Sequence, residues 1–356
     1  MKKSVTSVRL AMTFAGCFLG AGYISGREIW RFFGMFGIWG WLGLLLAMAC
    51  LAAVGGMTLL LVRKTGDDAP ERLFFPGNHP ILHKLVFLTE VLFLFGVCCI
   101  MTAGAGALLR QVLGLSRVWT SLLFALIVAL IALSGLDGLV ASLSFTTPVL
   151  TISAAIISVL AMTLFREQTV SPEPVVSGWL FSAVAFSSYN LFTSVAILAP
   201  LGRYVTEQQA RRGIAFGTAL LLLTAGFFLS AMNRNPSAVS AELPMLAVAG
   251  RISPMLEVFF AALLLLAMFG TSLSCFITGI NQLASWASFV RKWRTLSVFA
   301  ASFLAWAGSL FGFGNLIDYL YPVFGSVSFL FLFCMCVNYF RHTETCLHGY
   351  IEKQKQ

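Results

Sequence analysis

The residues with the most distinctive chemistry lie near the N-terminus, in a glycine-rich run that reads Gly20-Ala-Gly-Tyr-Ile-Ser-Gly26. A glycine inside a helix costs about 1 kcal/mol relative to alanine, so a helix through this run can unwind. Backbone groups freed at membrane depth are tolerated only where they line a protein cavity or bind something. We therefore predict a substrate site here, with close helix packing through small residues as the alternative. Its residues are Gly20, Ala21, Gly22, Tyr23, Ser25 and Gly26.

A second polar cluster interrupts an otherwise apolar segment in the other half of the chain. It consists of Ser187, Ser188, Tyr189 and Asn190. Paired interruptions in corresponding spans of two halves are the best sequence indication of a transporter binding site. We therefore expect this cluster to complete the substrate site. Interhelical hydrogen bonding is the alternative, and the absence of glycine makes unwinding a weaker expectation here than in the first run.

Two acidic residues are candidates for proton coupling, because carboxyl groups inside membrane spans are rare and are functional by default. Glu28 directly follows the glycine-rich run, and Glu90 lies in the third apolar segment. Each also has a structural interpretation. Glu28 can pair with Arg27 or Arg31, and Glu90 is only a turn or two from the end of its span. Both interpretations stay open.

The segments that carry these residues are membrane spans. Hydrophobic residues make up 59% of the 356 residues and charged residues only 10%, which leaves too little polar surface for a water-soluble globule. We therefore expect an all-α integral membrane protein with a single transmembrane domain, 1–356. Ten apolar segments are long enough to cross a bilayer, at about 8–33, 37–62, 85–109, 118–136, 139–165, 178–202, 212–232, 254–289, 295–313 and 315–340.

The basic residues predict the orientation of these spans. Sixteen of the 23 Lys and Arg residues fall on the side that holds both termini, and seven fall on the opposite side. The positive-inside rule then places both termini in the cytoplasm, with a short cytoplasmic tail at 341–356, in the cell (inner) membrane. Because these residues cluster at span ends, the net charge of +9 is no indication of nucleic-acid binding.

The connections between spans predict an internal repeat. Residues 63–84 are expected to form a solvated, partly irregular cytoplasmic loop. Residues 233–253 are expected to form an external loop with a short helical hairpin or lid that can occlude a pathway. A proline-containing break after residue 165 divides the chain into two groups of five spans, at 8–165 and 178–340. Two such groups of opposite orientation form inverted repeats, the architecture that gives two equivalent conformations open to opposite sides of a membrane.

The first and sixth spans resemble those of the YkvI-type membrane proteins, a group within the amino acid/polyamine/organocation superfamily. The resemblance rests on Gly20-Ala-Gly-Tyr-Ile-Ser-Gly-Arg-Glu-Ile29, Ser188-Tyr-Asn190 and Val195-Ala-Ile-Leu-Ala-Pro-Leu-Gly202. It implies the LeuT-type fold of the neurotransmitter-sodium symporters, a 5+5 inverted repeat with helices 1 and 6 broken around a central site. It does not imply a substrate, because a fold does not fix a function.

The same resemblance implies a sodium site. Sodium-coupled members of this fold use carbonyl groups of the span 1 break together with a Thr-Ser pair on span 8. Gly20, Thr271 and Ser272 occupy the matching positions in this sequence. Hydroxyl groups that bond their own helix backbone are the alternative, and a proton is the rival coupling ion.

It also implies an outer gate, because the fold relatives place an Arg of span 1 opposite an Asp of span 10. Asp318 lies at the outer end of span 10, and Arg27 and Arg31 share a face of the outer half of span 1. A salt bridge between Asp318 and one of these arginines is therefore expected. Contact of the charges with lipid headgroups is the alternative.

Together these features predict a secondary active transporter of a small zwitterion such as an amino acid, coupled to sodium or protons. Its partners are the solute, the coupling ion and the lipid bilayer, and its oligomeric state is open. We expect no enzyme activity and no cofactor besides sodium, because the spans hold no catalytic triad, metal-ligand cluster or phosphate loop. A channel fits less well, since no continuous polar pore is evident. A non-transporting nutrient sensor with the same fold stays open.

Overall fold

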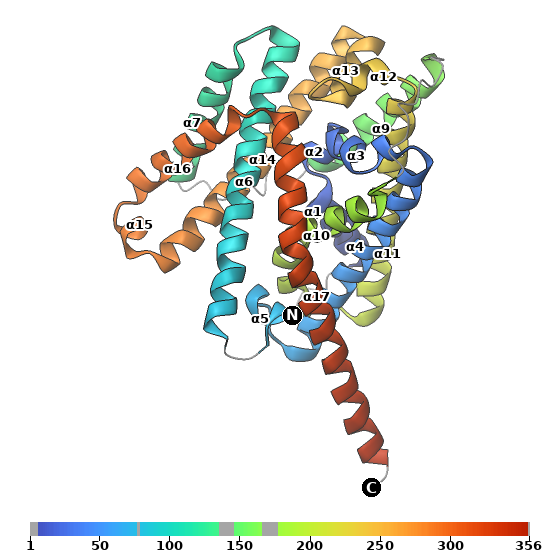
Figure 1. Ribbon diagram of the computed structural model, residues 1–356, viewed down its shortest axis with the longest axis vertical. Helices are drawn as coiled ribbons and strands as arrows, with labels where there is room; N and C mark the ends of the chain where they lie inside the picture. The colour runs from blue at the N-terminus through green and yellow to red at the C-terminus, as the bar shows by residue number, and fades with distance from the viewer. Residues whose placement is uncertain (1–5, 77–78, 135–145, 166–176, 355–356) are drawn as a thin grey trace.

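The computed structural model describes residues 6–76, 79–134, 146–165 and 177–354, with the last stretch described at side-chain level as far as Arg341. Over these residues all of the regular structure is helical. Figure 1 shows the helices running between two ends of a bundle, which we call the α13 side and the α5 side after a short helix at each end.

The first half of the chain begins with a span that is divided into three short helices, α1 (Ser7–Phe18), α2 (Ala21–Ile24) and α3 (Arg27–Phe32). A short 3-10 helix, η1 (Gly34–Phe36), follows. The remaining elements are α4 (Ile38–Thr65), α5 (Pro70–Phe74), α6 (Pro80–Leu113), α7 (Arg117–Ser134) and α9 (Thr146–Leu164). The expected parts of spans 4 and 5 at 135–136 and 139–145 lie outside the described residues.

The second half begins with a helix that is continuous for most of a span, α10 (Trp179–Leu198), followed by a 3-10 segment, η2 (Ala199–Tyr204). The other elements are α11 (Glu207–Asn233), α12 (Pro236–Val239), α13 (Pro244–Ile252), α14 (Pro254–Trp286), α15 (Ser288–Lys292), α16 (Arg294–Ser309) and α17 (Phe313–Gln354). The helical hairpin expected in 233–253 is confirmed as α12 and α13. The tail expected from residue 341 continues α17, which projects from the α5 side (Figure 1).

The described part of the connection 63–84 includes a short helix. This helix is α5, which docks against α17 on the α5 side. The Asn338 side-chain amide donates to the Leu73 carbonyl oxygen at 2.8 Å, and the rings of Phe74 and Phe331 lie 5.8 Å apart. Pro70 favours the helix start because the first turn needs no backbone N–H donor there.

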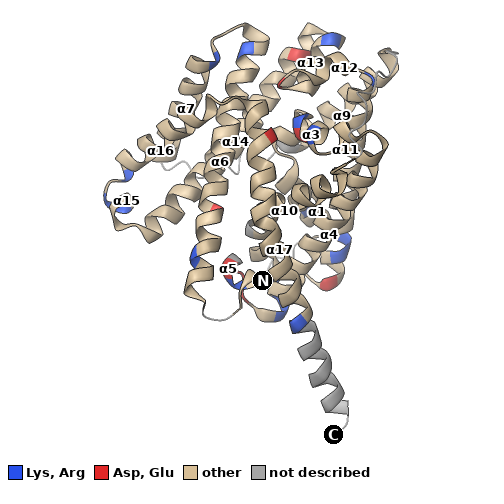
Figure 2. Cartoon of the chain, in the orientation of Figure 1, with Lys and Arg blue, Asp and Glu red and all other residues tan. Residues whose placement is uncertain are grey.

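The helices have the length and the surface of membrane spans. Six of them, over the described part of the chain, are long and apolar enough to cross a bilayer: α4, α6, α7, α11, α14 and α17 as far as Arg341. Their exposed faces carry large apolar side chains such as Leu88, Leu123 and Phe333. Lys and Arg gather toward the ends of the helices (Figure 2). The protein is therefore an all-α, multi-pass membrane protein.

The packing of the two halves is reciprocal. Helix α1 packs against α11 of the other half, and α10, which begins the second half, packs against α4 of the first. Helices α6 and α14, each the third expected span of its half, pack against each other. One hydrophobic core runs through all of these contacts. An inverted repeat would produce such an exchange of partners, and the repeats 8–165 and 178–340 stay a prediction.

Candidate functional site: the break in the first span

The first span unwinds where its glycines predict. Helix α1 ends at Phe18, and Gly20 adopts an extended conformation, with φ −76° and ψ 173°, before α2 begins. A second interruption separates α2 from α3 at Gly26, whose φ of 81° lies in the left-handed region. A Cβ atom at Gly26 would also come within 2.9 Å of Met245 Cγ. The interruption expected between Gly20 and Gly26 is therefore confirmed.

Helices α12 and α13, the expected lid, cover this break on the α13 side. The Met245 backbone N–H donates to the Ser25 carbonyl oxygen at 2.9 Å, which satisfies a carbonyl freed by the break. Arg117 at the start of α7 holds the lid from another side, because its Nη1 lies 3.0 Å from Glu242 Oε1. The break is thus covered on the α13 side.

Glu28, on the first turn of α3, folds back over the break. Its side chain is buried, and the Tyr189 hydroxyl donates to Oε2 at 2.7 Å. A Cβ atom at Gly22 would lie 1.9 Å from Glu28 Oε1, so only glycine at position 22 leaves room for the carboxylate. The structure therefore brings the glycine-rich run of span 1 together with Glu28 and with Tyr189 of span 6.

Tyr321 completes this arrangement, although the sequence patterns did not identify it. Its ring stacks on that of Tyr189, with centroids 4.4 Å apart and planes 11° apart. Tyr321 follows Asp318 by three residues, the spacing at which two side chains share a helix face. That spacing next to the expected gate residue is the signal that could have identified it.

Tyr23 is buried and points toward α11. Its hydroxyl donates to the Leu221 carbonyl oxygen at 2.6 Å, and its ring lies against those of Phe186 and Phe228. The side chain therefore ties the short helix α2 to α11. In this conformation its hydroxyl is engaged with protein and not with the space beside Gly20.

The polar cluster on α10 does not unwind its helix, so the interruption expected there is wrong. Ser187, Ser188 and Asn190 each donate a side-chain hydrogen bond of 2.8 to 2.9 Å to the backbone carbonyl four residues earlier. The helix satisfies these groups itself, and no glycine weakens it. The change in helix type comes later, at Ala199, beside Pro200, which has no N–H to donate. Of the cluster, Tyr189 reaches the break.

The expected gate residues lie together at the α13 side. Arg27 Nη2 is 2.5 Å from Asp318 Oδ2, and Arg31 Nε is 3.6 Å from Asp318 Oδ1. Arg27 therefore makes the closer ion pair. The pair forms part of a cleft of about 330 Å³ whose other lining residues are Trp30, Arg31, Met35, Val239 and Tyr319.

The expected sodium-site residues lie on two elements that pack together. Helix α14, which carries Thr271 and Ser272, packs against α2, which begins directly after Gly20. Ser272 is buried, and the Cys98 thiol lies 3.6 Å from its carbonyl oxygen. The sodium site stays a prediction.

Glu90 lies away from the break. It is a buried residue of α6 within electrostatic reach of Gln282 on α14 and Glu71 on α5, and so belongs to the α5 side. The structure therefore separates the two acidic candidates. Glu28 is at the break, and Glu90 is near the other end of the bundle.

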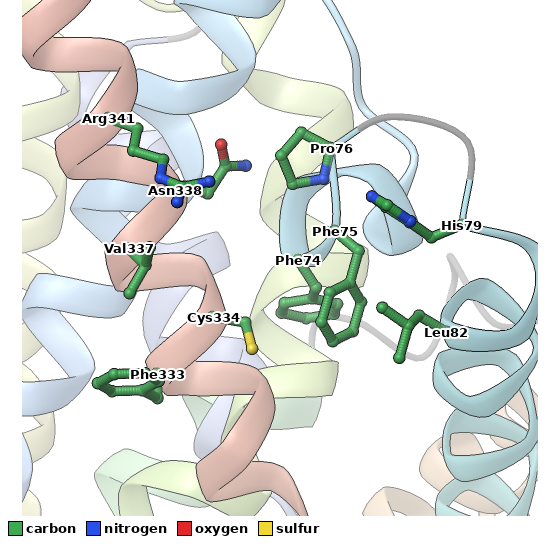
Figure 3. Close-up of a pocket in the computed structure, with 10 residues that line it drawn as sticks. All are labelled: Phe74, Phe75, Pro76, His79, Leu82, Phe333, Cys334, Val337, Asn338 and Arg341. Carbon is green, nitrogen blue, oxygen red and sulfur yellow. The ribbon is translucent and has the colours of Figure 1, made fainter.

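A second cavity, of about 250 Å³, opens on the α5 side between α5, the start of α6 and α17. Figure 3 shows the rings of Phe74 and Phe75 beside Cys334, with Asn338 and Arg341 further along α17. The cavity contains none of the predicted site residues. Its lining is largely apolar, with His79, Asn338 and Arg341 as its polar residues.

Comparisons with known proteins cover almost the whole chain. No family model matches it. The chain is 26% identical over 330 residues to the uncharacterized membrane protein YkvI of Bacillus subtilis (strain 168), covering 91% of this chain and 93% of that protein. It is 24% identical over 327 residues to the uncharacterized protein YyaD of the same organism, covering 90% and 93%. The resemblance to YkvI-type proteins is confirmed.

Solved transporter structures share the fold at 15% sequence identity. A Na+-coupled sialic acid symporter in an outward-open state has a TM-score of 0.61 over 93% of this chain and 79% of its own. Mhp1 is a nucleobase-cation-symport-1 family transporter, solved in a closed conformation with bromovinylhydantoin bound. Its TM-score is 0.60 over 91% of this chain and 75% of its own. A manganese transporter of Eremococcus coleocola has a TM-score of 0.54 over 91% of this chain and 76% of its own. The chain is therefore an all-α membrane protein with the LeuT-type transporter fold, similar along its length to YkvI.

Proposed function

We propose that this protein is a secondary active transporter of a small zwitterion, such as an amino acid, that works by alternating access. One observation carries the proposal. The first span breaks at Gly20 in the interior of a transporter fold, and a buried carboxylate, Glu28, closes over that break. Interrupted helices at this position are the binding elements of this transporter architecture.

The solute site that we propose is the open space beside Gly20. A Cβ atom there would meet nothing within 4 Å, and the residue is partly exposed. The Gly16 and Cys17 carbonyl groups of α1 and the first N–H groups of α2 have no backbone partner one turn away, whereas the Phe18 carbonyl accepts the Gly20 N–H at 2.7 Å. Carbonyl groups favour an ammonium group and N–H groups favour a carboxylate, and a zwitterion carries both.

The two ends of the first span support alternating access. On the α13 side, the Arg27–Asp318 pair and the lid close the break. On the α5 side, the face of α1 that carries Thr13 and Gly16 is at least partly exposed, and a Cβ atom at Gly16 would meet nothing within 4 Å. This face leads along α1 to Gly20. With the orientation predicted from basic residues, the conformation is closed outside and open toward the cytoplasm.

The test is uptake of a radiolabelled mixture of the protein amino acids into proteoliposomes, with sodium and proton gradients imposed separately. We expect accumulation driven by a gradient, and a loss of at least about tenfold in the Gly20→Val variant, because the added side chain fills the proposed solute space. Gly56→Val is the matched control, since Gly56 on α4 also has nothing within 4 Å of a Cβ position. Its uptake should match that of the parent.

Two outcomes would argue against the proposal. Saturable binding without accumulation under either gradient would favour a nutrient sensor with the same fold. No saturable binding of any component of the mixture, with Gly20→Val and the parent indistinguishable, would contradict the proposed site itself.

A further inference from the structure

Glu28 is a buried carboxylate that accepts a hydrogen bond from Tyr189, a neutral group. Its exposed fraction is 6%, and the ion pairs found among the described residues do not include it. Arg27 and Arg31, the partners that the sequence offers, both turn to Asp318 instead. The carboxylate therefore lies in the protein interior without a paired cation, which is an unfavourable state for a full negative charge.

The titratable and charged groups around Glu28 come from α2, α3, α10, α14 and α17. Helix α2 contributes Tyr23, α10 contributes Tyr189 and α17 contributes Tyr321, and all three tyrosines are within electrostatic reach of the carboxylate. The α3 and α17 charges nearby, Arg27 with Arg31 and Asp318, bind each other. Neither η1 nor the Leu221–Asn233 part of α11 has a charged residue, and α14 brings Cys275 toward Tyr321.

The packing also leaves little room for a metal cation at this carboxylate. Oε1 lies against the backbone of Gly22, so closely that a single added carbon would overlap it, and Oε2 accepts the hydroxyl of Tyr189. A sodium ion needs several oxygen ligands around it, whereas a proton needs only the carboxylate oxygen. A protonated carboxyl is neutral and still accepts the Tyr189 hydrogen bond.

We propose that Glu28 is the proton-binding site of this transporter and that its coupling ion is a proton. The inference rests on the proposed transport function. When the Arg27–Asp318 pair opens, a proton from water forms an O–H bond with a carboxylate oxygen of Glu28. That bond breaks when the proton passes to water on the other side. Because the carboxyl lies against Gly22, its charge acts directly on the break where the solute binds.

The first experiment detects the proton without any solute. The purified protein in lipid is examined by infrared spectroscopy from about pH 5 to about pH 9, a range in which an unperturbed Glu is ionised. We expect the C=O stretching band of a protonated carboxylic acid at neutral pH in the parent. The band should be lost in Glu28→Gln and kept in Glu90→Gln and Asp318→Asn. A band that survives Glu28→Gln unchanged, or no such band in the parent, overturns the proposal.

A second variant guards against misfolding of Glu28→Gln. Tyr189→Phe keeps the carboxyl but removes the hydrogen bond to Oε2, so the same band should shift to higher frequency without being lost. A band that does not move in Tyr189→Phe belongs to another carboxyl group and also overturns the assignment.

The transport experiment uses the same radiolabelled amino-acid mixture. In Glu28→Gln, accumulation driven by a pH gradient should fall at least about tenfold, while exchange of labelled for unlabelled solute continues, because glutamine mimics the protonated state. Accumulation driven only by a sodium gradient and unaffected by Glu28→Gln would refute proton coupling. If the parent transports nothing, the proposed function fails, and the infrared result still decides whether Glu28 holds a proton.

Discussion

The packing between the first and the last helix differs between the two halves of the molecule. Helix α10 packs along α17 for much of its length, whereas α1, which holds the corresponding place in the other half, makes at most marginal contact with the described part of α9. Glycines mark both sites. A Cβ atom at Gly325 on α17 would lie 2.6 Å from the Ala185 carbonyl oxygen, but one at Gly16 on α1 would meet nothing.

This difference gives a physical meaning to the proposed repeat. Two halves with the same architecture need not adopt the same packing at the same time. In the conformation described here the α10–α17 pair is closed and the face of α1 is open. We expect the opposite conformation to exchange these roles, with α1 approaching α9 while α10 and α17 separate, because alternating access in inverted repeats follows from such an exchange.

The largest expected effect is on the rate of thiol labelling, which reports whether water or lipid fills the space beside α1. In a background without native cysteines, Gly16→Cys should react with a membrane-impermeant thiol reagent at least about tenfold faster than Ala15→Cys, because reactivity requires a water-exposed thiolate. Ala15 is the matched control, since it is the adjacent residue and is buried. Equal and slow labelling of both variants would mean that the exposed face of α1 meets lipid, and the comparison of the two helix pairs would lose its functional meaning.

The closed pair is tested by Gly325→Ala. The added methyl group must push α17 away from the α10 backbone, an overpacking that we expect to destabilise the protein by about 1 to 3 kcal/mol. Thermal unfolding in detergent, followed by tryptophan fluorescence, measures the change. Gly16→Ala is the control, and it should be neutral or slightly stabilising because alanine favours a helix and meets no neighbour there. A Gly325→Ala variant as stable as Gly16→Ala would show that the helices approach less closely than described.

A smaller effect is expected for the hydrogen bond that joins α10 to Glu28. Tyr189→Phe keeps the stacked ring and removes the donor to Oε2, so the free energy of unfolding should fall by about 0.5 to 1.5 kcal/mol if Glu28 is neutral. If Glu28 is ionised, the loss should be nearer the range of about 1.5 to 3 kcal/mol for bonds to charged groups. Tyr319→Phe is the control, because Tyr319 is 74% exposed. Reversible denaturant unfolding in mixed micelles compares the variants.

The contrast between the two polar clusters shows how far sequence reasoning reaches. The break at Gly20 to Gly26 was predictable, since a glycine lowers helix stability locally whatever its tertiary contacts are. The prediction of a break at Ser187 to Asn190 was wrong. The identity of polar residues does not say whether their hydrogen-bond partners lie in their own helix or across an interface. Here each of the two serines and the asparagine donates to a carbonyl of its own helix, and Ser187 also lies 3.3 Å from the Ala47 carbonyl oxygen of α4.

For contacts between distant segments, the sequence could offer only alternative pairs of residues. The sequence offered Asp318 both Arg27 and Arg31, and it offered Glu28 the same two arginines. Which pair forms depends on how α3 lies against α17, and α3 follows a left-handed turn at Gly26 and a lid contact at the Ser25 carbonyl. Sequence spacing carries no information on such a tertiary contact. The Tyr189–Tyr321 stack is also such a contact: spacing could have placed Tyr321 on the same helix face as Asp318, but not against the ring of Tyr189.

The smallest effect on stability is expected for the gate itself, and it separates a gate from a structural ion pair. The Arg27 and Asp318 side chains are 19% and 24% exposed, so Arg27→Gln should lower the free energy of unfolding by no more than about 1 kcal/mol. Arg31→Gln should lower the free energy of unfolding by less still, because Arg31 Nε lies 3.6 Å from Asp318 Oδ1 and the Arg31 side chain is 35% exposed. If the pair is a gate, its loss shifts the population toward the conformation open on the α13 side. Labelling at Gly16→Cys should then slow in the Arg27→Gln background, and it should remain fast in the Arg31→Gln background. A pair with only a structural role would lower stability in the same small measure and leave the labelling rate unchanged, because it would favour neither of the two packings of α1.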